Sequence, residues 1–393
     1  MKKLLIIVIA SLFVTLPANA ATLKQISVKS LTPLTTIGSV SEVSGVITRG
    51  SEIILYGSKD EKSYVRAIDS SGKELWKYEL SPELHSIATA GTIDSSGNIW
   101  IAGSASQTFM APVETLSPLN PDGVGANIGE TSYEFDAVVL WKIPLELSTP
   151  VTFVNQQESS ILINSVAADK NGVSIVGEIA TKTGSAGFLI NTDTAGTFTQ
   201  LMKIGELATK LNSVLRNKDG SKTLFGSSSE ALAGKKLLSI TDGVIITIDS
   251  QNELIKVIRS SELKAKRSWN SASSVLLLGG SIIKGSITQS AVTKFSKTFV
   301  PQWTYKIDST GFTYTTGTNR ALISSTSPIT TLRGWAPKSA RAILLTFDLK
   351  GTISEAYSAP AKYNEVFGLI DSKDLGVIVL AVSDQTISAF SAK

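Results

Sequence analysis

Short apolar runs alternate with tight polar turns along this chain, and one unit of that pattern recurs. Its clearest copy is Ile93–Ser104, IDSSGNIWIAGS. Asp94, Gly97 and Asn98 are turn residues, because Asp and Asn side chains bond the nearby backbone and Gly accepts a positive φ. Ile99–Ile101 is a short apolar run bounded by turn residues, which indicates a buried strand. The unit therefore predicts a turn followed by a buried strand that ends at Gly-Ser.

Seven segments of the chain carry this turn-and-strand unit. They are Gly50–Ser58, Gly97–Ser104, Asn171–Ile179, Gly220–Ser228, Ser273–Ser281, Asn319–Ser327 and Gly376–Ser383. Their starts are 47, 74, 49, 53, 46 and 57 residues apart. One four-stranded blade of a β-propeller takes about 40–50 residues, so only the second interval needs an insertion.

Each copy is preceded by a strand of small residues, which suits an innermost strand crowded around a central axis. These strands are Glu42–Ile47, His85–Ile93, Asn164–Ala168, Asn212–Leu215, Arg267–Ala272, Thr313–Thr316 and Asn364–Ile370. A third and a fourth strand follow most copies. The pattern therefore predicts an all-β chain folded as a seven-bladed β-propeller with four-stranded antiparallel blades.

The seventh unit has a third strand, Thr386–Ser391, and no fourth strand after it in this sequence. At the other end, Leu23–Leu31 alternates apolar and polar residues as a strand does. We expect Leu23–Leu31 to supply the missing strand, so that an N-terminal strand joins the last blade, closes the ring and protects the sheet edges. The alternative is a disordered leader. Residues 21–393 are expected to form a single domain.

Residues 1–20 have the pattern of a secretory signal peptide. Lys2 and Lys3 form a basic start, Leu4–Leu16 carries no charge, and Ala18–Ala20 is a small-residue cleavage site. The alternative is a membrane anchor, but the 13 residues of Leu4–Leu16 rise only about 20 Å as a helix, less than a hydrocarbon core of about 30 Å. We expect a bacterial protein that is secreted or kept in the periplasm or cell envelope, with no transmembrane segment after cleavage.

Charge and composition narrow the classes of function. The chain has 37 basic and 33 acidic residues, and removal of Lys2 and Lys3 leaves a net charge near +2. This balance predicts neither a nucleic-acid-binding nor a polybasic surface. The chain has no cysteine and one histidine, His85, so a zinc site is not expected. Asn120–Gly123 is the best candidate for a calcium loop but lacks the remaining ligands, so we expect no metal and no cofactor.

Two stretches resemble known repeats. Asp94–Ser104, DSSGNIWIAGS, resembles the blade signature Asp-x-x-Gly-Asn-x-Tyr/Trp-x-x-Gly of secreted bacterial β-propeller repeat proteins. Ala67–Leu80, AIDSSGKELWKYEL, resembles the Gly-Lys-x-x-Trp element of quinoprotein-type propeller repeats. The resemblance implies a propeller fold. It carries over no catalytic residue, because both motifs are structural turns and strands.

The long connections between the second and third strands of a blade all belong to one face of the predicted ring. They are residues 105–135, 227–242 and 326–340. Long loops on one face of a repeat protein often carry function. We therefore expect the binding site on this face.

The first of these loops is acidic and the last is basic. Glu130, Glu134 and Asp136 could accept hydrogen bonds from the hydroxyls or amines of a ligand. The candidate residues of the last loop are Arg333, Trp335 and Arg341. The two arginines could pair with a ligand carboxylate, and the indole could offer a flat apolar platform. The alternative is that all six residues belong to ordinary solvated loops.

Two functions remain open. The first is an exported binding or structural module, expected to be a monomer, whose partner is a small molecule, a glycan or an envelope protein. The second is an envelope or extracellular carbohydrate-active enzyme that uses the carboxylates of the same face. A glycoside hydrolase needs two carboxylates held about 5–10 Å apart. The carboxylates here lie mostly in a long loop, whereas catalytic groups usually stand on rigid elements, so binding is favoured.

Overall fold

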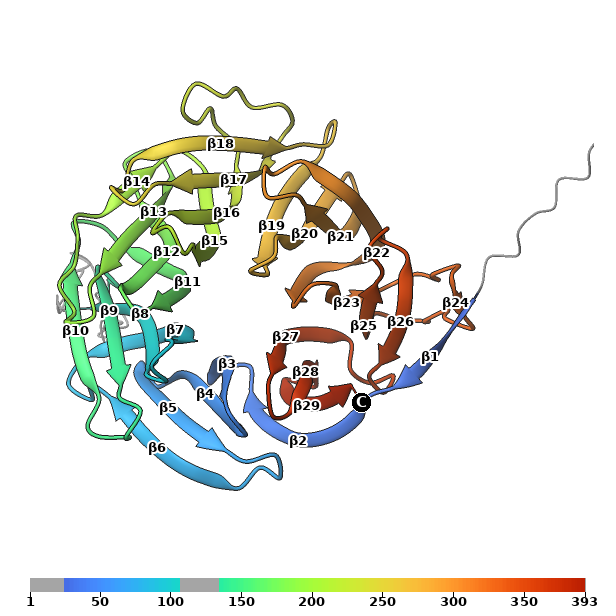
Figure 1. Ribbon diagram of the computed structural model, residues 1–393, viewed down its shortest axis with the longest axis horizontal. Helices are drawn as coiled ribbons and strands as arrows, with labels where there is room; N and C mark the ends of the chain where they lie inside the picture. The colour runs from blue at the N-terminus through green and yellow to red at the C-terminus, as the bar shows by residue number, and fades with distance from the viewer. Residues whose placement is uncertain (1–24, 107–133, 393) are drawn as a thin grey trace, which may run out of the picture.

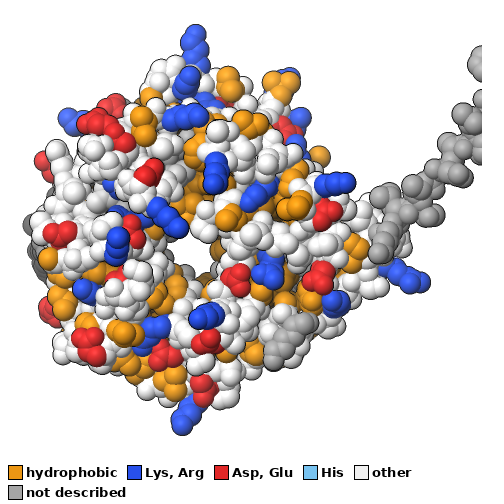
Figure 2. All heavy atoms as spheres, in the orientation of Figure 1, with side chains coloured by type: hydrophobic (Ala, Val, Ile, Leu, Met, Phe, Trp, Pro, Cys, Tyr) orange, Lys and Arg blue, Asp and Glu red, His pale blue; other side chains and the backbone are white. Residues whose placement is uncertain are grey.

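The computed structural model describes residues 25–106 and 134–392, and the regular structure of this part consists of β-strands alone. No helix that could cross a bilayer occurs among these residues. The strands form five four-stranded sheets and one nine-stranded sheet. The sheets follow one another around a central opening, and each sheet has a strand next to the opening (Figure 1). The opening is also visible between the side chains in Figure 2.

The sheets are built from strands that are neighbours in sequence. The first of these sheets contains β3 (Val43–Arg49), β4 (Glu52–Lys59), β5 (Lys62–Ile68) and β6 (Glu74–Leu80), and the second contains β7 (His85–Ile93), β8 (Ile99–Ser106), β9 (Ala137–Ile143) and β10 (Val151–Gln156). The third contains β11 (Ile161–Asp169), β12 (Gly172–Ala180), β13 (Ser185–Thr192) and β14 (Met202–Ile204). The fourth contains β15 (Thr209–Arg216), β16 (Lys222–Ser228), β17 (Asp242–Ile248) and β18 (Leu254–Ser260). Every pair of neighbouring strands in these sheets is antiparallel. The all-β class and the four-stranded antiparallel sheets expected from the sequence are confirmed.

The nine-stranded sheet arises because one strand is shared by two groups. Its strands are β19 (Lys266–Ala272), β20 (Leu277–Lys284), β21 (Ile287–Phe295), β22 (Pro301–Thr316), β23 (Arg320–Ser325), β25 (Arg341–Phe347), β26 (Ile353–Ser358), β1 (Ile26–Ser30) and β24 (Leu332–Arg333). The first part of β22 pairs with β21, and the part from Ser309 onward pairs with β23. β22 thus ends one antiparallel group as its outermost strand and starts the next as its innermost strand.

Strands from both ends of the chain meet in the remaining sheet, which contains β27 (Glu365–Ser372), β28 (Gly376–Ser383), β29 (Thr386–Ala392) and β2 (Thr32–Ser39). β2 pairs antiparallel with β29, so an N-terminal strand does complete the last sheet. The expectation that Leu23–Leu31 supplies this strand is wrong. β1 instead pairs parallel with β26 and β24. Pro33 lies in the outermost strand of its sheet, the position where a missing N–H is tolerated.

The recurring Asp turn has the structure that the sequence predicts. At Asp94, Oδ1 accepts hydrogen bonds from the backbone N–H groups of Ser96 and Asn98, at 2.8 and 3.0 Å. Oδ2 accepts a 2.9 Å bond from the indole N–H of Trp100, whose ring is buried in the core. Burial opposes ionisation of Asp94, but the bonds from Trp100 and Asn98 lower its pKa below the ordinary value. The turn thus fixes the start of β8 and the position of a core tryptophan together.

Candidate ligand-binding cavity

Each innermost strand carries a β-bulge, and the bulges occur at corresponding places around the ring. The pairing register shifts at Val43/Gly45, Ala88/Ala90, Ile163/Ser165, Leu211/Ser213, Trp269/Ser271, Ser309/Thr313 and Val366/Gly368. A bulge leaves a residue out of the ladder and can redirect its side chain. Residues left out in this way are Ser44, Thr89, Asn164, Asn212, Asn270, Phe312 and Phe367.

The glycine that ends the repeated unit makes room for the bulge. A Cβ atom at Gly177 would lie 1.9 Å from the carbonyl oxygen of Leu162, and one at Gly226 would lie 1.9 Å from that of Lys210. Gly57, Gly103 and Gly280 have the same close approach to a backbone oxygen of the innermost strand. Glycine therefore recurs at five of the seven bulges because it lets the second strand approach the bulged one so closely, whereas Ser325 and Ala381 pair at the corresponding places of the other two.

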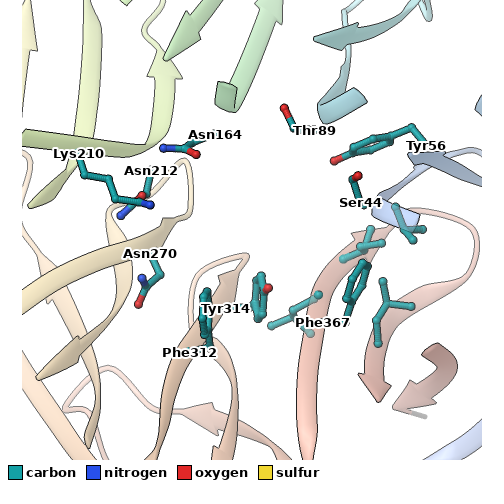
Figure 3. Close-up of a pocket in the computed structure, with 16 residues that line it drawn as sticks. Ser44, Tyr56, Thr89, Asn164, Lys210, Asn212, Asn270, Phe312, Tyr314 and Phe367 are labelled. Carbon is teal, nitrogen blue, oxygen red and sulfur yellow. The ribbon is translucent and has the colours of Figure 1, made fainter. Parts of the chain in front are cut away.

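All seven of these bulge residues line a cavity of ≈ 440 Å³ at the centre of the ring. Figure 3 shows two sides of different chemistry. Asn164, Lys210, Asn212 and Asn270 extend from one side, and aromatic rings that include Tyr314 lie opposite them. The cavity volume falls within the range of about 300–1,000 Å³ typical of small-ligand sites.

The polar side is held in place by a hydrogen bond that is repeated between neighbouring sheets. The bulged side chain of one sheet donates to the carbonyl oxygen of the residue before the bulge in the next sheet. The three bonds join Thr89 Oγ1 to Ile163 O at 2.7 Å, Asn164 Nδ2 to Leu211 O at 2.9 Å, and Asn212 Nδ2 to Trp269 O at 2.8 Å. Each asparagine uses its N–H group in this bond, which leaves its amide oxygen for a ligand.

Asn270 continues this row but lacks the bond. Its Oδ1 atom is buried and accepts no hydrogen bond from the described residues. A buried acceptor without a donor costs free energy. Because this oxygen is closed to solvent, it would meet a ligand's hydroxyl or N–H group only after the Asn270 amide turns toward the cavity, and that turn would recover a hydrogen bond that the described structure lacks.

One basic side chain and its acidic partner complete the polar side. The ammonium group of Lys210 lies 2.8 Å from the Glu178 carboxylate. Asn164 Nδ2 lies 3.4 Å from the same oxygen of Glu178. The ion pair fixes Lys210 beside the two asparagines and keeps the cavity wall close to neutral.

The opposite side presents aromatic rings. Phe312 and Tyr314 are stacked, with ring centroids 6.5 Å apart and an interplanar angle of 21°. Burial raises the pKa of Tyr314 to about 12, so its hydroxyl stays protonated at neutral pH. Tyr56 reaches the cavity from β4, the second strand of its sheet. Gly45 makes this possible because it has no side chain, and a Cβ there would lie 2.1 Å from the Tyr56 hydroxyl oxygen. Burial also raises the pKa of Tyr56.

Of the three residues expected in the acidic loop, the two that the structure describes, Glu134 and Asp136, do not line this cavity. Glu130 lies outside the described residues. Glu134 accepts a 2.9 Å hydrogen bond from the Ser160 hydroxyl and lines a separate groove. Asp136 is only 9% exposed, and its backbone oxygen accepts a bond from the N–H of Gln157. The prediction of Asp136 as an open acceptor for a ligand is therefore wrong, because this residue is packed at the start of β9.

Of the residues expected in the basic loop, Trp335 and Arg341 pack against the protein, and Arg333 is exposed. Trp335 is 6% exposed and belongs to the hydrophobic core, so it is no platform for a ligand. The Arg341 guanidinium stacks over this indole at 5.2 Å and donates to the carbonyl oxygen of Ala359. Arg333 is exposed on β24, which pairs with β1. Figure 1 shows β24 and β9 on opposite sides of the ring, so Arg333 on β24 does not lie beside Asp136, which precedes β9.

The sequence nevertheless contained a signal for the cavity. Asn164, Asn212 and Asn270 all fall within or at the start of strands that were expected to be innermost. An amide recurring at one place in a repeat is a candidate for a shared role. The aromatic side gave no comparable signal, because Tyr56 lies on a second strand and Phe312 and Phe367 resemble ordinary core residues in sequence.

The described residues contain no group of three or more His, Cys, Asp or Glu side chains that could hold a metal ion. His85 lies 3.2 Å from the Glu61 carboxylate at the outer end of β7.

Neither a family model nor a curated protein sequence matches this chain. Among solved structures, it is similar to an uncharacterized protein from Listeria monocytogenes EGD-e, with 10% identity, a TM-score of 0.47 and coverage of 91% of this chain and 92% of that one. It is also similar to Sqt1 from Chaetomium thermophilum, with 10% identity, a TM-score of 0.44 and coverage of 93% and 100%.

Proposed function

We propose that the chain is an exported seven-bladed β-propeller that binds a glycan in its central cavity. The propeller is supported by the repeated unit in the sequence and by the way in which the sheets follow one another around an opening (Figure 1). Division of the nine-stranded sheet at β22 gives one group of four antiparallel strands and a second in which β22, β23, β25 and β26 are antiparallel and are extended by the parallel strands β1 and β24. Export is supported by the signal-peptide pattern of residues 1–20.

The observation that carries the proposed function is the two-sided lining of the cavity. Sugars present hydroxyl groups at their edges and an apolar C–H face, so they suit a site with amides on one side and aromatic rings on the other. The amide oxygen of Asn212, and that of Asn270 once its amide turns toward the cavity, can accept hydrogen bonds from hydroxyls. Tyr314 and Phe312 offer stacked rings for the C–H face. Such a pocket holds a neutral, hydroxylated ligand better than a purely apolar or a highly charged one.

The experiment is a glycan-array screen of residues 21–393, followed by calorimetric titration of the best oligosaccharide. Asn270→Ala is the sharpest variant, because its amide oxygen has no partner in the described structure and its removal should leave the fold intact. Loss of one or two ligand hydrogen bonds should lower affinity about tenfold. Tyr314→Ala should also lower affinity by removing the stacking ring.

The matched control is Gln156→Ala, which removes an exposed amide on the outermost strand β10. Its affinity should equal that of the wild type. If Asn270→Ala and Gln156→Ala both bind as the wild type does, the cavity is not the glycan site.

A second candidate function, a carbohydrate-active enzyme, is favoured by one observation. Glu134 and Glu178 line the same groove of ≈ 410 Å³ beside the cavity. Two carboxylates in one groove are the minimum for glycoside hydrolysis. An enzyme of this kind would release reducing ends from the bound oligosaccharide, and Glu134→Gln would abolish that release without loss of binding. Binding with no release of reducing ends would leave only the binding function.

A further inference from the structure

Three loops at one end of the ring lie side by side. They connect β16 to β17, β18 to β19, and β20 to β21, and alternation of strand direction places all three at the same end of their sheets. The Ser239 hydroxyl in the first loop donates to the carbonyl oxygen of Ala265 in the second, at 3.0 Å. Lys266 pairs with Ile283 where the second and third loops meet. The three loops thus form one continuous surface.

This surface exposes large aliphatic side chains on the loops and on the adjoining ends of β20 and β21. The exposed fractions are 62% for Leu238, 52% for Ile240, 72% for Leu263, 41% for Ile283 and 56% for Ile287. Single exposed apolar residues are common on proteins, but several on neighbouring loops mark an interaction surface.

Lysines lie among these apolar tips and are exposed with them. They are Lys235, Lys236, Lys264, Lys266 and Lys284. None of the five makes an ion pair with another described residue.

The carboxylates near these lysines already have other hydrogen-bond partners. Glu262 pairs with Lys306, and that hydrogen bond lowers the pKa of Glu262. Glu230 accepts bonds from the backbone N–H groups of Glu206, Leu207 and Ala208. The five lysines outnumber the two carboxylates of these three loops, so the surface is basic, although the charges of the whole chain are nearly balanced.

We propose that this apolar and basic loop surface docks the protein on a bilayer that contains anionic phospholipid. Exposed aliphatic side chains can enter the headgroup region, and lysines around them bind the anionic headgroups. A nucleic-acid surface would not need the aliphatic side chains. The docking surface rests on different residues from the glycan cavity, so either proposal can fail without the other.

The test is co-sedimentation of residues 21–393 with vesicles of phosphatidylcholine alone, and of phosphatidylcholine with phosphatidylglycerol as the minor component. The wild type should bind the anionic vesicles, and raised salt should weaken that binding. The double substitution Lys235→Gln and Lys236→Gln should lower the partition coefficient about 25-fold, since each lysine near an anionic surface contributes about a factor of five. Leu263→Ser should lower it as well.

The matched control is Leu349→Ser with Lys350→Gln. These two residues form an exposed apolar and basic tip, with Leu349 98% exposed, on the turn between β25 and β26 at the opposite end of the ring. The control should bind anionic vesicles as the wild type does, and all variants should keep the wild-type melting temperature.

Three results would overturn the docking surface. The first is a wild type that does not sediment with anionic vesicles at low salt, which includes the case of a protein that binds only a soluble macromolecule. The second is unchanged binding by the lysine variant, and the third is an equal loss in the control.

Discussion

The glycines that face the bulges provide the most quantitative test of the fold. In Gly177→Ala, the new Cβ would lie 1.9 Å from the Leu162 carbonyl oxygen, whereas ordinary contacts begin at 3.4 Å. The two strands would have to separate by about 1.5 Å at this point. Because the obstacle is backbone and cannot rotate away, we expect a cost at the upper end of the overpacking range, about 3 kcal/mol.

The assay is thermal unfolding of the mature chain, followed by circular dichroism. With an unfolding entropy of about 2.1 cal/mol/K per residue, or about 0.8 kcal/mol/K for the mature chain, a loss of 3 kcal/mol lowers Tm by about 4 °C. The control is Gly368→Ala on β27, where the nearest atom to a Cβ is the end of the Leu380 side chain, at 3.1 Å. This flexible neighbour can move, so Tm should stay within about 1 °C of the wild-type value. A Gly177→Ala protein that melts with the wild type would refute the reasoning.

Three further predictions concern the turns and the ends of the chain. Asp94→Ala should lower the free energy of unfolding by about 2 kcal/mol, since it leaves the indole N–H of Trp100 buried without an acceptor, and equal stability of Asp94→Ala and wild type in urea would contradict this. Hydrogen bonds from neighbouring hydroxyl and backbone groups lower the pKa of Asp69 and Asp219 in the folded state. The two ionised carboxylates therefore stabilise the fold above the ordinary pKa near 4, and this stabilisation is lost as the pH falls below it. A Tm that does not fall on acidification from pH 5 would contradict the assignment. A truncation that removes β2 (Thr32–Ser39) together with the residues before it should lower Tm far more than one that ends before Thr32, because only β2 completes the last sheet. Equal Tm values for the two truncations would exclude that role.

The repeat could be predicted from the sequence because it depends on local interactions between residues that are close in sequence. Asp94 and Gly97 form the turn that their residue types predict. His85–Ile93 is a strand with the predicted boundaries. Alternation of apolar and polar residues also identified β1 as a strand, but alternation carries no information on the partner strand, and β1 pairs with β26 instead of β29.

The candidate site was not readable in the same way, because it depends on contacts between sheets. Loop length and charge drew attention to Trp335 and Arg341, yet the indole is buried in the core and the guanidinium packs on it. The bulge that exposes Asn212 to the cavity arises from the register of two strands, which residue types alone do not fix. Tyr56 enters the cavity only because Gly45 on the neighbouring strand leaves space for its ring.

The central claim is that the bulged residues of the innermost strands form a glycan site at the centre of the ring. The most direct measurement is a crystal structure of residues 21–393 with the oligosaccharide that binds best in the array. The account predicts a sugar ring against Tyr314, with hydroxyl groups within hydrogen-bond distance of the Asn212 and Asn270 amide oxygens. A sugar bound on the outer loops, with the central cavity containing only water, would contradict it.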